Sequence, residues 1–131
     1  MARKDDVVWY LTLERMDADG VAVIAAEGRI SQRTAPDLQR LLTAAIESAR
    51  RGVVLDLSGV DYISSAGLGL LEQLAARLGS DGCRLVLCQL QDPVRAALAL
   101  AGSVPHLTIE STRDAAVEGI RNADASRQET R

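Results

Sequence analysis

The stretch VVLDLSGVDYISSAGLGLL, from Val53 to Leu71, determines how the rest of the chain is organised. Its aliphatic run Val53–Leu57 is typical of a parallel strand that is buried on both faces. Residues Ser58 to Ile63 are expected to form a short connection. Leucine and alanine then recur at helical spacing from Ser64 to Gly79. The sequence therefore predicts a strand that leads through a short connection into the N-terminus of a helix.

Two hydroxyls and two glycines lie where this helix is predicted to begin. Free backbone N–H groups and the positive end of the helix dipole favour an anion or a phosphate at such a place. Ser64 and Ser65 can also be explained as helix caps, because serine often satisfies the first N–H groups of a helix. Gly67 and Gly69 each cost up to about 1 kcal/mol relative to alanine in a helix. Two glycines so close together indicate that something approaches the backbone, as at a docking surface that can be modified.

The part of the chain before this stretch predicts two strands and a helix. Val7–Met16 alternates apolar and polar residues, as a strand does, and Asp17–Gly20 is a turn signal. Val21–Ala26 follows as a second strand, antiparallel to the first. Thr34 is the expected N-cap of a helix that ends near Arg50–Gly52. A β-hairpin is thus expected to precede the first helix.

The part of the chain after the stretch predicts two more strands and two more helices. Cys83–Cys88 is an aliphatic strand, and Asp92 is the expected cap of a short helix that Gly102 ends. Leu107–Ile109 forms a short edge strand. A capping box at Ser111–Asp114 opens the last helix.

The predicted order is ββαβαβαβα, and such alternation is typical of a mostly parallel sheet with helical crossovers. We therefore expect an α/β fold with a mixed, mostly parallel sheet of four to five strands and about four helices. The length of 131 residues predicts a single domain over residues 1–131. Its core is expected to span about residues 7–121, with residues 1–6 and 122–131 as flexible tails.

The composition excludes several classes of function. The net charge is −3, from 15 basic and 18 acidic residues, so no basic field favours nucleic acid. Residues 1–10 are charged and do not have the apolar stretch expected of a signal peptide, and no apolar run approaches the roughly 18 residues of a membrane span. A cytoplasmic protein is therefore expected, with no direct partner among nucleic acids or membranes.

Residue types that carry enzyme chemistry are present, but their spacing does not favour catalysis or metal binding. His106 is the only histidine and is expected on the surface. Cys83 and Cys88 are too far apart along one strand for a disulfide, and with His106 they lack the spacing of a zinc site. They are interpreted as reduced core residues. Asp56 and Asp61 could be paired carboxylates, but Asp56 is better explained as a cap of a loop and Asp61 as a turn residue.

A nucleotide-binding loop is also not favoured. Gly67 and Gly69 follow a strand, as in a dinucleotide fingerprint, but that fingerprint needs a third glycine where this chain has Glu72. Lys4 is the only lysine, so no phosphate-binding loop of the Walker type exists. No cofactor, no metal and no catalytic residue is therefore predicted.

At this point the sequence resembles the STAS domain family, named for sulfate transporters and anti-sigma factor antagonists. The resemblance covers nearly the whole chain and is strongest in four segments: Glu27–Ile30, Val53–Ser58, Tyr62–Gly69 and Ser111–Ala116. It implies a STAS-like fold. In its bacterial anti-sigma factor antagonist branch, the serine that precedes the small residue and the glycine is phosphorylated, and here that serine is Ser65.

The resemblance implies a partner switch without catalysis by this chain. The unphosphorylated protein would bind an anti-sigma factor that is also a serine kinase of the GHKL type, and this would release a sigma factor for transcription. Phosphorylation of Ser65 would end the complex, and a PP2C-type phosphatase would reset it. The implied partner surface comprises Ser31, Tyr62, Ile63, Ser64, Gly67, Leu68, Gly69 and Glu72.

Two positions depart from the family pattern, because Ser64 and Ser31 stand where aspartate is usual. Slower phosphorylation of Ser65, or a different kinase, would follow if those carboxylates help to orient the hydroxyl. Two alternatives are left open by the sequence. One is a STAS adaptor subunit of a lipid-transport ABC system. The other, ranked last, is an enzyme or a small-molecule binder.

Overall fold

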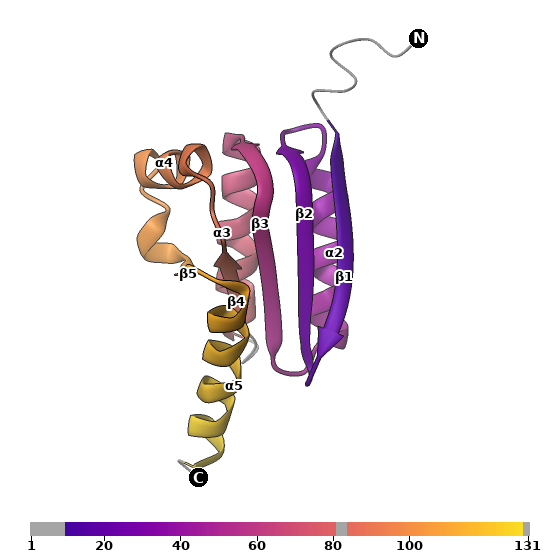
Figure 1. Cartoon of the computed structure of the whole chain (residues 1–131), viewed down its shortest axis with the longest axis vertical. Coiled ribbons are helices and arrows are strands. Elements are labelled where there is room, and N and C mark those ends of the chain that lie inside the picture. The colour runs from indigo at the N-terminus through magenta and orange to yellow at the C-terminus, as the bar shows by residue number, and fades with distance from the viewer. Residues whose placement is uncertain (1–9, 81–83, 130–131) are drawn as a thin grey trace.

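The computed structural model describes residues 10–80 and 84–129. It contains a five-stranded sheet in the order β1-β2-β3-β4-β5, in which β1 is antiparallel to β2 and the other neighbours are parallel (Figure 1). This confirms the predicted α/β fold with a mixed, mostly parallel sheet. The strands are β1 (Leu11–Ala18), β2 (Val21–Ile30), β3 (Gly52–Ile63), β4 (Arg84–Cys88) and β5 (Thr108–Glu110). The helices are α2 (Ala35–Ser48), α3 (Ser65–Ser80), α4 (Asp92–Leu100) and α5 (Arg113–Glu129), with a short 3₁₀ turn, η1 (Val104–His106).

The predicted hairpin is present, with a tighter turn than expected. Asp17 pairs with Ala22 and Ala18 pairs with Val21, so the loop consists only of Asp19 and Gly20. Both loop residues have positive φ, 53° and 81°, as the twist of a two-residue hairpin requires. Strand β1 therefore ends at Ala18 rather than Met16, and residues 7–9 of the predicted strand lie outside the described residues.

The sheet separates two apolar layers of unequal size. The larger cluster joins one face of the sheet to α2, α3 and α4, with Ile24, Leu55 and Leu71 fully buried in it. The smaller cluster lies on the other face under α5, which contributes Ala116 and Ile120. Figure 1 shows α5 along β4, while α2 lies behind β1 and β2 and α3 lies behind β3 and β4. Helices α2 and α3 follow neighbouring parallel strands on the same face, so their N-termini lie at the same end of the sheet.

The second half of β3 was predicted as a connection, and this was wrong. Residues Ser58 to Ile63 continue the strand, because β2 also extends past Ala26 to Ile30 and pairs with them. The ladder shifts register twice, between Ala25 and Glu27 and between Gly28 and Arg29. Such irregularities let two strands stay paired through glycines that weaken local strand preference.

Several helix ends differ from the prediction by one residue or more. Helix α2 ends at Ser48, before the expected Arg50–Gly52. Gln91 rather than Asp92 is the N-cap of α4, which ends just before Gly102 as expected. Thr112 caps α5, because its Oγ1 accepts a hydrogen bond from the Ala115 N–H at 3.0 Å, in place of the predicted box at Ser111.

The two ends of the last strand–helix unit also differ from the prediction. Strand β5 is shifted by one residue to Thr108–Glu110, and it pairs in parallel with β4 at the sheet edge. Helix α5 continues to Glu129 and so includes residues 122–129 of the predicted C-terminal tail.

Candidate functional site

The start of α3 separates its two serines into different environments. The Ser64 N–H donates to the Ile30 carbonyl at 2.8 Å, which ties the strand end to β2. Its hydroxyl accepts a hydrogen bond from the Gly67 N–H at 3.2 Å, and its carbonyl accepts one from the Leu68 N–H at 2.9 Å. Ser64 is therefore the half-buried N-cap of α3, as the capping interpretation predicted for one of the two serines.

Ser65 is the first residue of α3 and is exposed. Within residues 10–80 and 84–129, its hydroxyl makes no hydrogen bond. The first turn of α3 contains no acidic residue, so no side chain there offsets the positive end of the helix dipole. A negative group attached to this hydroxyl would stand at the favourable end of a 16-residue helix.

Internal packing requires one of the two glycines of this turn, Gly67, but does not require the other, Gly69. A Cβ on Gly67 would lie 2.6 Å from Ile30 Cγ2 and 2.9 Å from Ile63 Cγ1, so the core of the chain itself requires this glycine. A Cβ on Gly69 would meet nothing within 4 Å. The idea that an outside molecule requires both glycines is thus wrong for Gly67, because Ile30 and Ile63 are what approaches it. Gly69 alone leaves open surface.

Four residues of the predicted partner surface are buried. Gly67, Ile63 and Leu68 pack in the core, the last two at 6% and 8% exposure. Ser31 is 4% exposed, and its N–H donates to Thr34 Oγ1 at 2.8 Å. Thr34 is the N-cap residue of α2, as predicted. Its Oγ1 donates to the Arg29 carbonyl at 2.7 Å and so fixes the preceding loop, and it makes no capping hydrogen bond to the helix. These side chains hold the surface in place and offer little contact area.

The other members of the predicted surface in α3 follow one ridge of the helix, where Ser65 and Gly69 are exposed and Glu72 is half-buried. Ser65, Gly69 and Glu72 are spaced four and three residues apart, which aligns them on one helix face. Beside them, Tyr62 is 39% exposed. The guanidinium carbon of Arg29 lies 5.9 Å from the centre of the Tyr62 ring.

Two hollows flank this ridge. One, of about 420 Å³, lies between the loop before α2 and the end of β3, and is lined by Ser31, Gln32, Arg33, Tyr62 and Ser64. The other, of about 540 Å³, is a groove between α2 and α3, and is lined by Gln32, Ala35, Pro36, Gln39, Ala66, Gly69, Leu70 and Gln73. None of the residues that line the groove is charged, so a partner can cover it without desolvating a charge.

The α2 side of this groove was missed by the sequence reasoning. Pro36 and Gln39 are three residues apart in α2 and lie on the same face of that helix. The crossover rule could have placed the start of α2 near the start of α3, because helices after neighbouring parallel strands start at the same end of a sheet. The predicted partner surface includes one residue from this part of the chain, Ser31, and none from α2.

Asp56, set aside as a loop cap, is the centre of a buried polar cluster. It is 2% exposed and accepts hydrogen bonds from the Ser58 N–H at 2.9 Å and from Gln89 Nε2 at 2.7 Å. Arg113, the first residue of α5, donates to the same carboxylate through Nε at 3.0 Å and through a terminal nitrogen at 2.8 Å. Gln89 has a positive φ of 56°, uncommon outside glycine. The cluster therefore joins β3, the end of β4 and α5, a structural role wider than a cap.

Cys88 lies next to this cluster and is buried as predicted. Burial, and then the nearby charge of Asp56, raise the pKa of the Cys88 thiol to about 12. Such a thiol stays protonated at neutral pH and is a poor nucleophile. Cys83 lies outside the described residues.

The remaining candidates show no catalytic grouping. Asp61, predicted in a turn, lies in β3 and forms an exposed ion pair with Arg29 at 3.4 Å. His106 is exposed in η1. Among the residues that the structure describes, no group of three histidine, cysteine or acidic side chains could hold a metal ion, and no helix is long and apolar enough to span a membrane.

A small α/β domain with an exposed hydroxyl at the start of its second long helix fits the family that the sequence resembles. The STAS domain model matches residues 13–116, most of the chain, so the chain belongs to the STAS domain family. The "Putative anti-sigma factor antagonist BtrV" of Bordetella bronchiseptica is 33% identical over 113 residues, which cover 86% of this chain and 96% of that protein.

Two further relatives carry similar names. The anti-sigma-F factor antagonist RsfB of Mycobacterium tuberculosis is 26% identical over 117 residues, which cover 89% of this chain and 95% of RsfB. The crystal structure of an anti-sigma factor antagonist from Mycobacterium paratuberculosis superposes with a TM-score of 0.78 at 26% identity. That match covers 92% of this chain and 99% of the other.

Proposed function

We propose that this protein is an anti-sigma factor antagonist that binds an anti-sigma factor through the α3 ridge and is switched off by phosphorylation of Ser65. The names of the relatives support the class of function. The observation that carries the site is the exposed Ser65 hydroxyl, free of hydrogen bonds within the described ranges, beside a groove without charged residues. In this proposal the chain regulates by binding and performs no catalysis.

The physics of the switch is local. A phosphate adds about −1.5 to −2 charges and considerable bulk. At the first position of α3 it would be stabilised by the helix dipole, so the fold itself need not change. In a closed complex the same phosphate would need to be desolvated, or paired with a cation from the partner. Loss of the complex therefore requires no rearrangement of the domain.

Two partners belong to this proposal. The anti-sigma factor is a serine kinase of the GHKL type that phosphorylates Ser65, and a PP2C-type phosphatase removes the phosphate. The cycle operates in the cytoplasm. Ser64 cannot easily replace Ser65 as the acceptor, because its hydroxyl already accepts the hydrogen bond from Gly67 and is half-buried.

The test combines labelling with capture. Kinases encoded beside this protein are incubated with it and radiolabelled ATP, and Ser65→Ala should abolish the label. Ser111→Ala is the matched control, since Ser111 is also exposed but follows the edge strand β5, two strands away from β3. The captured partner should be lost from Ser65→Glu and kept by Ser111→Ala. Label on another residue, or capture that Ser65→Glu leaves unchanged, would contradict the proposal.

The same capture addresses the adaptor alternative. An ATPase subunit of a transporter, bound equally by the native protein and by Ser65→Glu, would favour a structural role in a lipid-transport ABC system. A GHKL kinase that only the native protein retains would favour the partner switch.

A further inference from the structure

The outer edge of β1 is the clearest surface that the proposed function does not use. Strand β1 ends the sheet order, so no other strand of residues 10–80 and 84–129 pairs with its outer side. The Arg29 N–H donates to the Tyr10 carbonyl, which fixes the phase of the β1–β2 ladder. Because the ladder alternates, the N–H and C=O groups of Leu11, Leu13 and Arg15 point away from β2. An open edge of this kind is a template for another strand.

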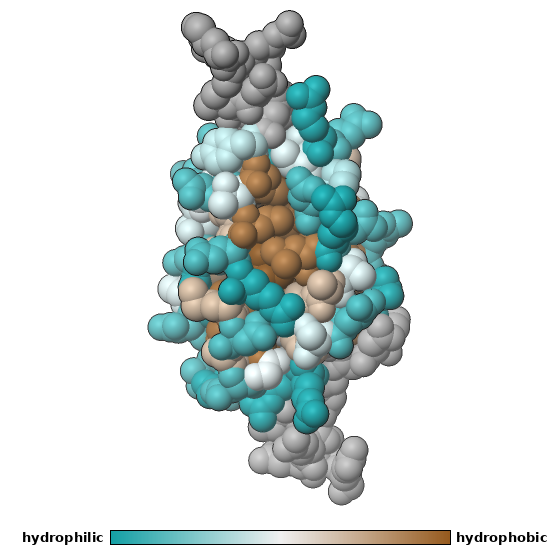
Figure 2. All heavy atoms as spheres, turned by 90° about the vertical axis from the view of Figure 1, so that its right-hand side faces the viewer, coloured by the Kyte–Doolittle hydropathy of each residue, from teal (hydrophilic) through white to brown (hydrophobic). Residues whose placement is uncertain are grey.

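An apolar strip lies along the helix side of this edge. Leu11 and Leu13 of β1 and Leu41 of α2 are only partly buried against the core. Ser48 lies two turns after Leu41 and contacts Arg15, so Leu41 is on the side of α2 that faces β1. Figure 2 shows a continuous hydrophobic patch on this side of the molecule.

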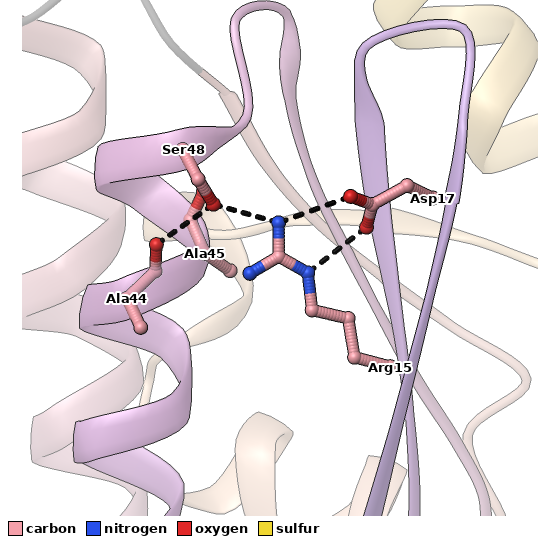
Figure 3. A network of polar contacts seen from close by, with 5 residues as sticks. All are labelled: Arg15, Asp17, Ala44, Ala45 and Ser48. Carbon is pink, nitrogen blue, oxygen red and sulfur yellow. Dashed lines mark hydrogen bonds and ion pairs between the residues drawn. The ribbon is translucent and has the colours of Figure 1, made fainter.

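Two charges beside the strip, those of Arg15 and Asp17, neutralise each other. Arg15 donates to Asp17 through Nε at 2.9 Å, and one of its terminal nitrogens donates to Asp17 at 3.2 Å and to Ser48 Oγ at 2.6 Å (Figure 3). The Ser48 hydroxyl in turn donates to the Ala44 carbonyl at 2.9 Å. This network connects β1 to α2, and leaves the apolar strip beside it with no unpaired charge from Arg15 or Asp17.

We propose that two copies of this chain pair through β1, antiparallel, about a two-fold axis at Thr12. In this register Leu11 of one copy lies opposite Leu13 of the other, and both pairs face the α2 helices. Leu11 and Leu13 both present outward backbone groups, so they form the hydrogen-bonded pairs. Thr12 then faces Thr12 of the second copy in a non-hydrogen-bonded pair.

The side chains of β1 favour this register over its neighbours. An axis at Leu13 would place Leu11 opposite Arg15, which is already bonded to Asp17 and Ser48. An axis at Glu14 would place two glutamates opposite each other, and like charges in that position are destabilising. Only the axis at Thr12 places both Leu11 and Leu13 opposite a leucine of the other copy, whereas the axis at Leu13 does so for Leu13 alone. A second copy therefore complements this edge, and two-fold dimers are the commonest oligomers.

Such a dimer is compatible with the proposed function and does not rest on it. Leu41 faces β1, whereas Gln39 lines the groove on the α3 side of α2. The Ser65 ridge would therefore stay open in both copies, and one dimer would offer two independent partner sites.

The first test is the dependence of mass on concentration. Analytical ultracentrifugation of the full chain from micromolar to submillimolar concentration should show a shift from monomer to dimer. Leu13→Lys should raise the dimer dissociation constant at least tenfold. Met16→Lys adds the same charge on the opposite face of the strand, where Met16 is 53% exposed, and should change it less than threefold. Circular dichroism checks that both variants fold. A protein that stays monomeric throughout would overturn the proposal.

The second test fixes the register. Non-hydrogen-bonded pairs have Cα atoms about 4.5 Å apart, which a disulfide can bridge. Thr12→Cys should therefore form a cross-linked dimer under mild oxidation, whereas Glu14→Cys should not. The native protein, treated in the same way, reports any dimer that arises from Cys83 or Cys88. A cross-link through Glu14→Cys alone would overturn the register, and absence of both cross-links would overturn the pairing.

Discussion

Asp56 and Ser65 belong to the same strand–helix unit, yet the fold treats their polar side chains in opposite ways. Asp56 is 2% exposed, and its carboxylate accepts hydrogen bonds from Ser58, Gln89 and Arg113. Ser65 is exposed, and its hydroxyl has no hydrogen-bond partner in the part of the chain that the structure describes. The hydrogen-bonding capacity of Asp56 is satisfied within the domain, whereas that of Ser65 remains available to solvent or to another molecule.

This difference in burial and hydrogen bonding distinguishes a polar residue with a structural role from one that is available for function. A buried carboxylate must be given partners, because burial without them is costly, so its surroundings are fixed by folding. An exposed hydroxyl imposes no such demand and can be modified without disturbing the domain. Substitutions at the first kind of position should change stability, and substitutions at the second should change binding alone.

Removal of the Asp56 carboxylate should have the largest effect on stability. Asp56→Ala leaves Arg113, Gln89 and the Ser58 N–H without their acceptor. We expect a loss of about 3 kcal/mol, at the low end for a broken buried ion pair because Arg113 is 34% exposed. Asp61→Ala is the matched control, since its ion pair with Arg29 is exposed and should contribute less than about 1 kcal/mol. Urea unfolding measures both, and equal losses would contradict the assignment.

Acid should destabilise the protein through the Asp56 cluster, because it protonates the buried carboxylate. Burial alone would raise the pKa of Asp56, but hydrogen bonds from Ser58 and Arg113 and the charge of Arg113 together hold it below 3.8. The folded state therefore favours the carboxylate more than the unfolded state does. Its contribution is complete above the unfolded pKa and is lost as the pH falls through the lower, folded pKa.

This pH dependence can be assigned to one residue. The native protein should lose more unfolding free energy than Asp56→Asn when the pH is lowered from neutral to about 3 or below. Ser65→Ala should follow the native curve throughout. If Asp56→Asn and the native protein lose stability in parallel, the acid sensitivity arises elsewhere.

The sequence predicted the element order and the sheet, because aliphatic runs and cap signals are local. It failed where pairing overrides local preference. Ser58–Ile63 contains a glycine and two polar residues and was expected as a connection, but hydrogen bonding to the extended β2 holds it in the sheet. Likewise, Asp56 and Arg113 are 57 residues apart, so no spacing in the sequence could show that they meet.

The candidate site was also predicted only in part, because some of its features depend on local sequence and others on contacts between distant segments. Ser64 and Ser65 were found from a local pattern at a helix start, and the structure separates them into a cap and an exposed residue. The two glycines were given one explanation, but Gly67 is required by Ile30, which lies on another strand. Only the folded chain distinguishes a glycine needed for internal packing from one that faces solvent.

The two glycines should respond oppositely to alanine. Gly67→Ala forces a Cβ against Ile30 and Ile63, and such overpacking should cost about 2 kcal/mol. Gly69→Ala meets nothing within 4 Å and should stabilise α3 by up to about 1 kcal/mol through helix propensity. Thermal unfolding measures both. Binding of the captured partner should nevertheless weaken in Gly69→Ala, since a methyl group then projects into the groove, and unchanged binding would place the partner elsewhere.

The two serines should show the smallest difference in stability and the clearest difference in function. Ser64→Ala removes the cap on the Gly67 N–H and should cost about 1 kcal/mol. Ser65→Ala removes an exposed hydroxyl and should change stability by less than about 0.5 kcal/mol. Phosphorylation should show the reverse order, because Ser64→Ala keeps the acceptor hydroxyl and Ser65→Ala removes it. Urea unfolding and radiolabel incorporation on the same pair of variants measure both orders. If Ser65→Ala were the less stable variant, its hydroxyl would have a structural partner, and the contrast with Asp56 would no longer hold.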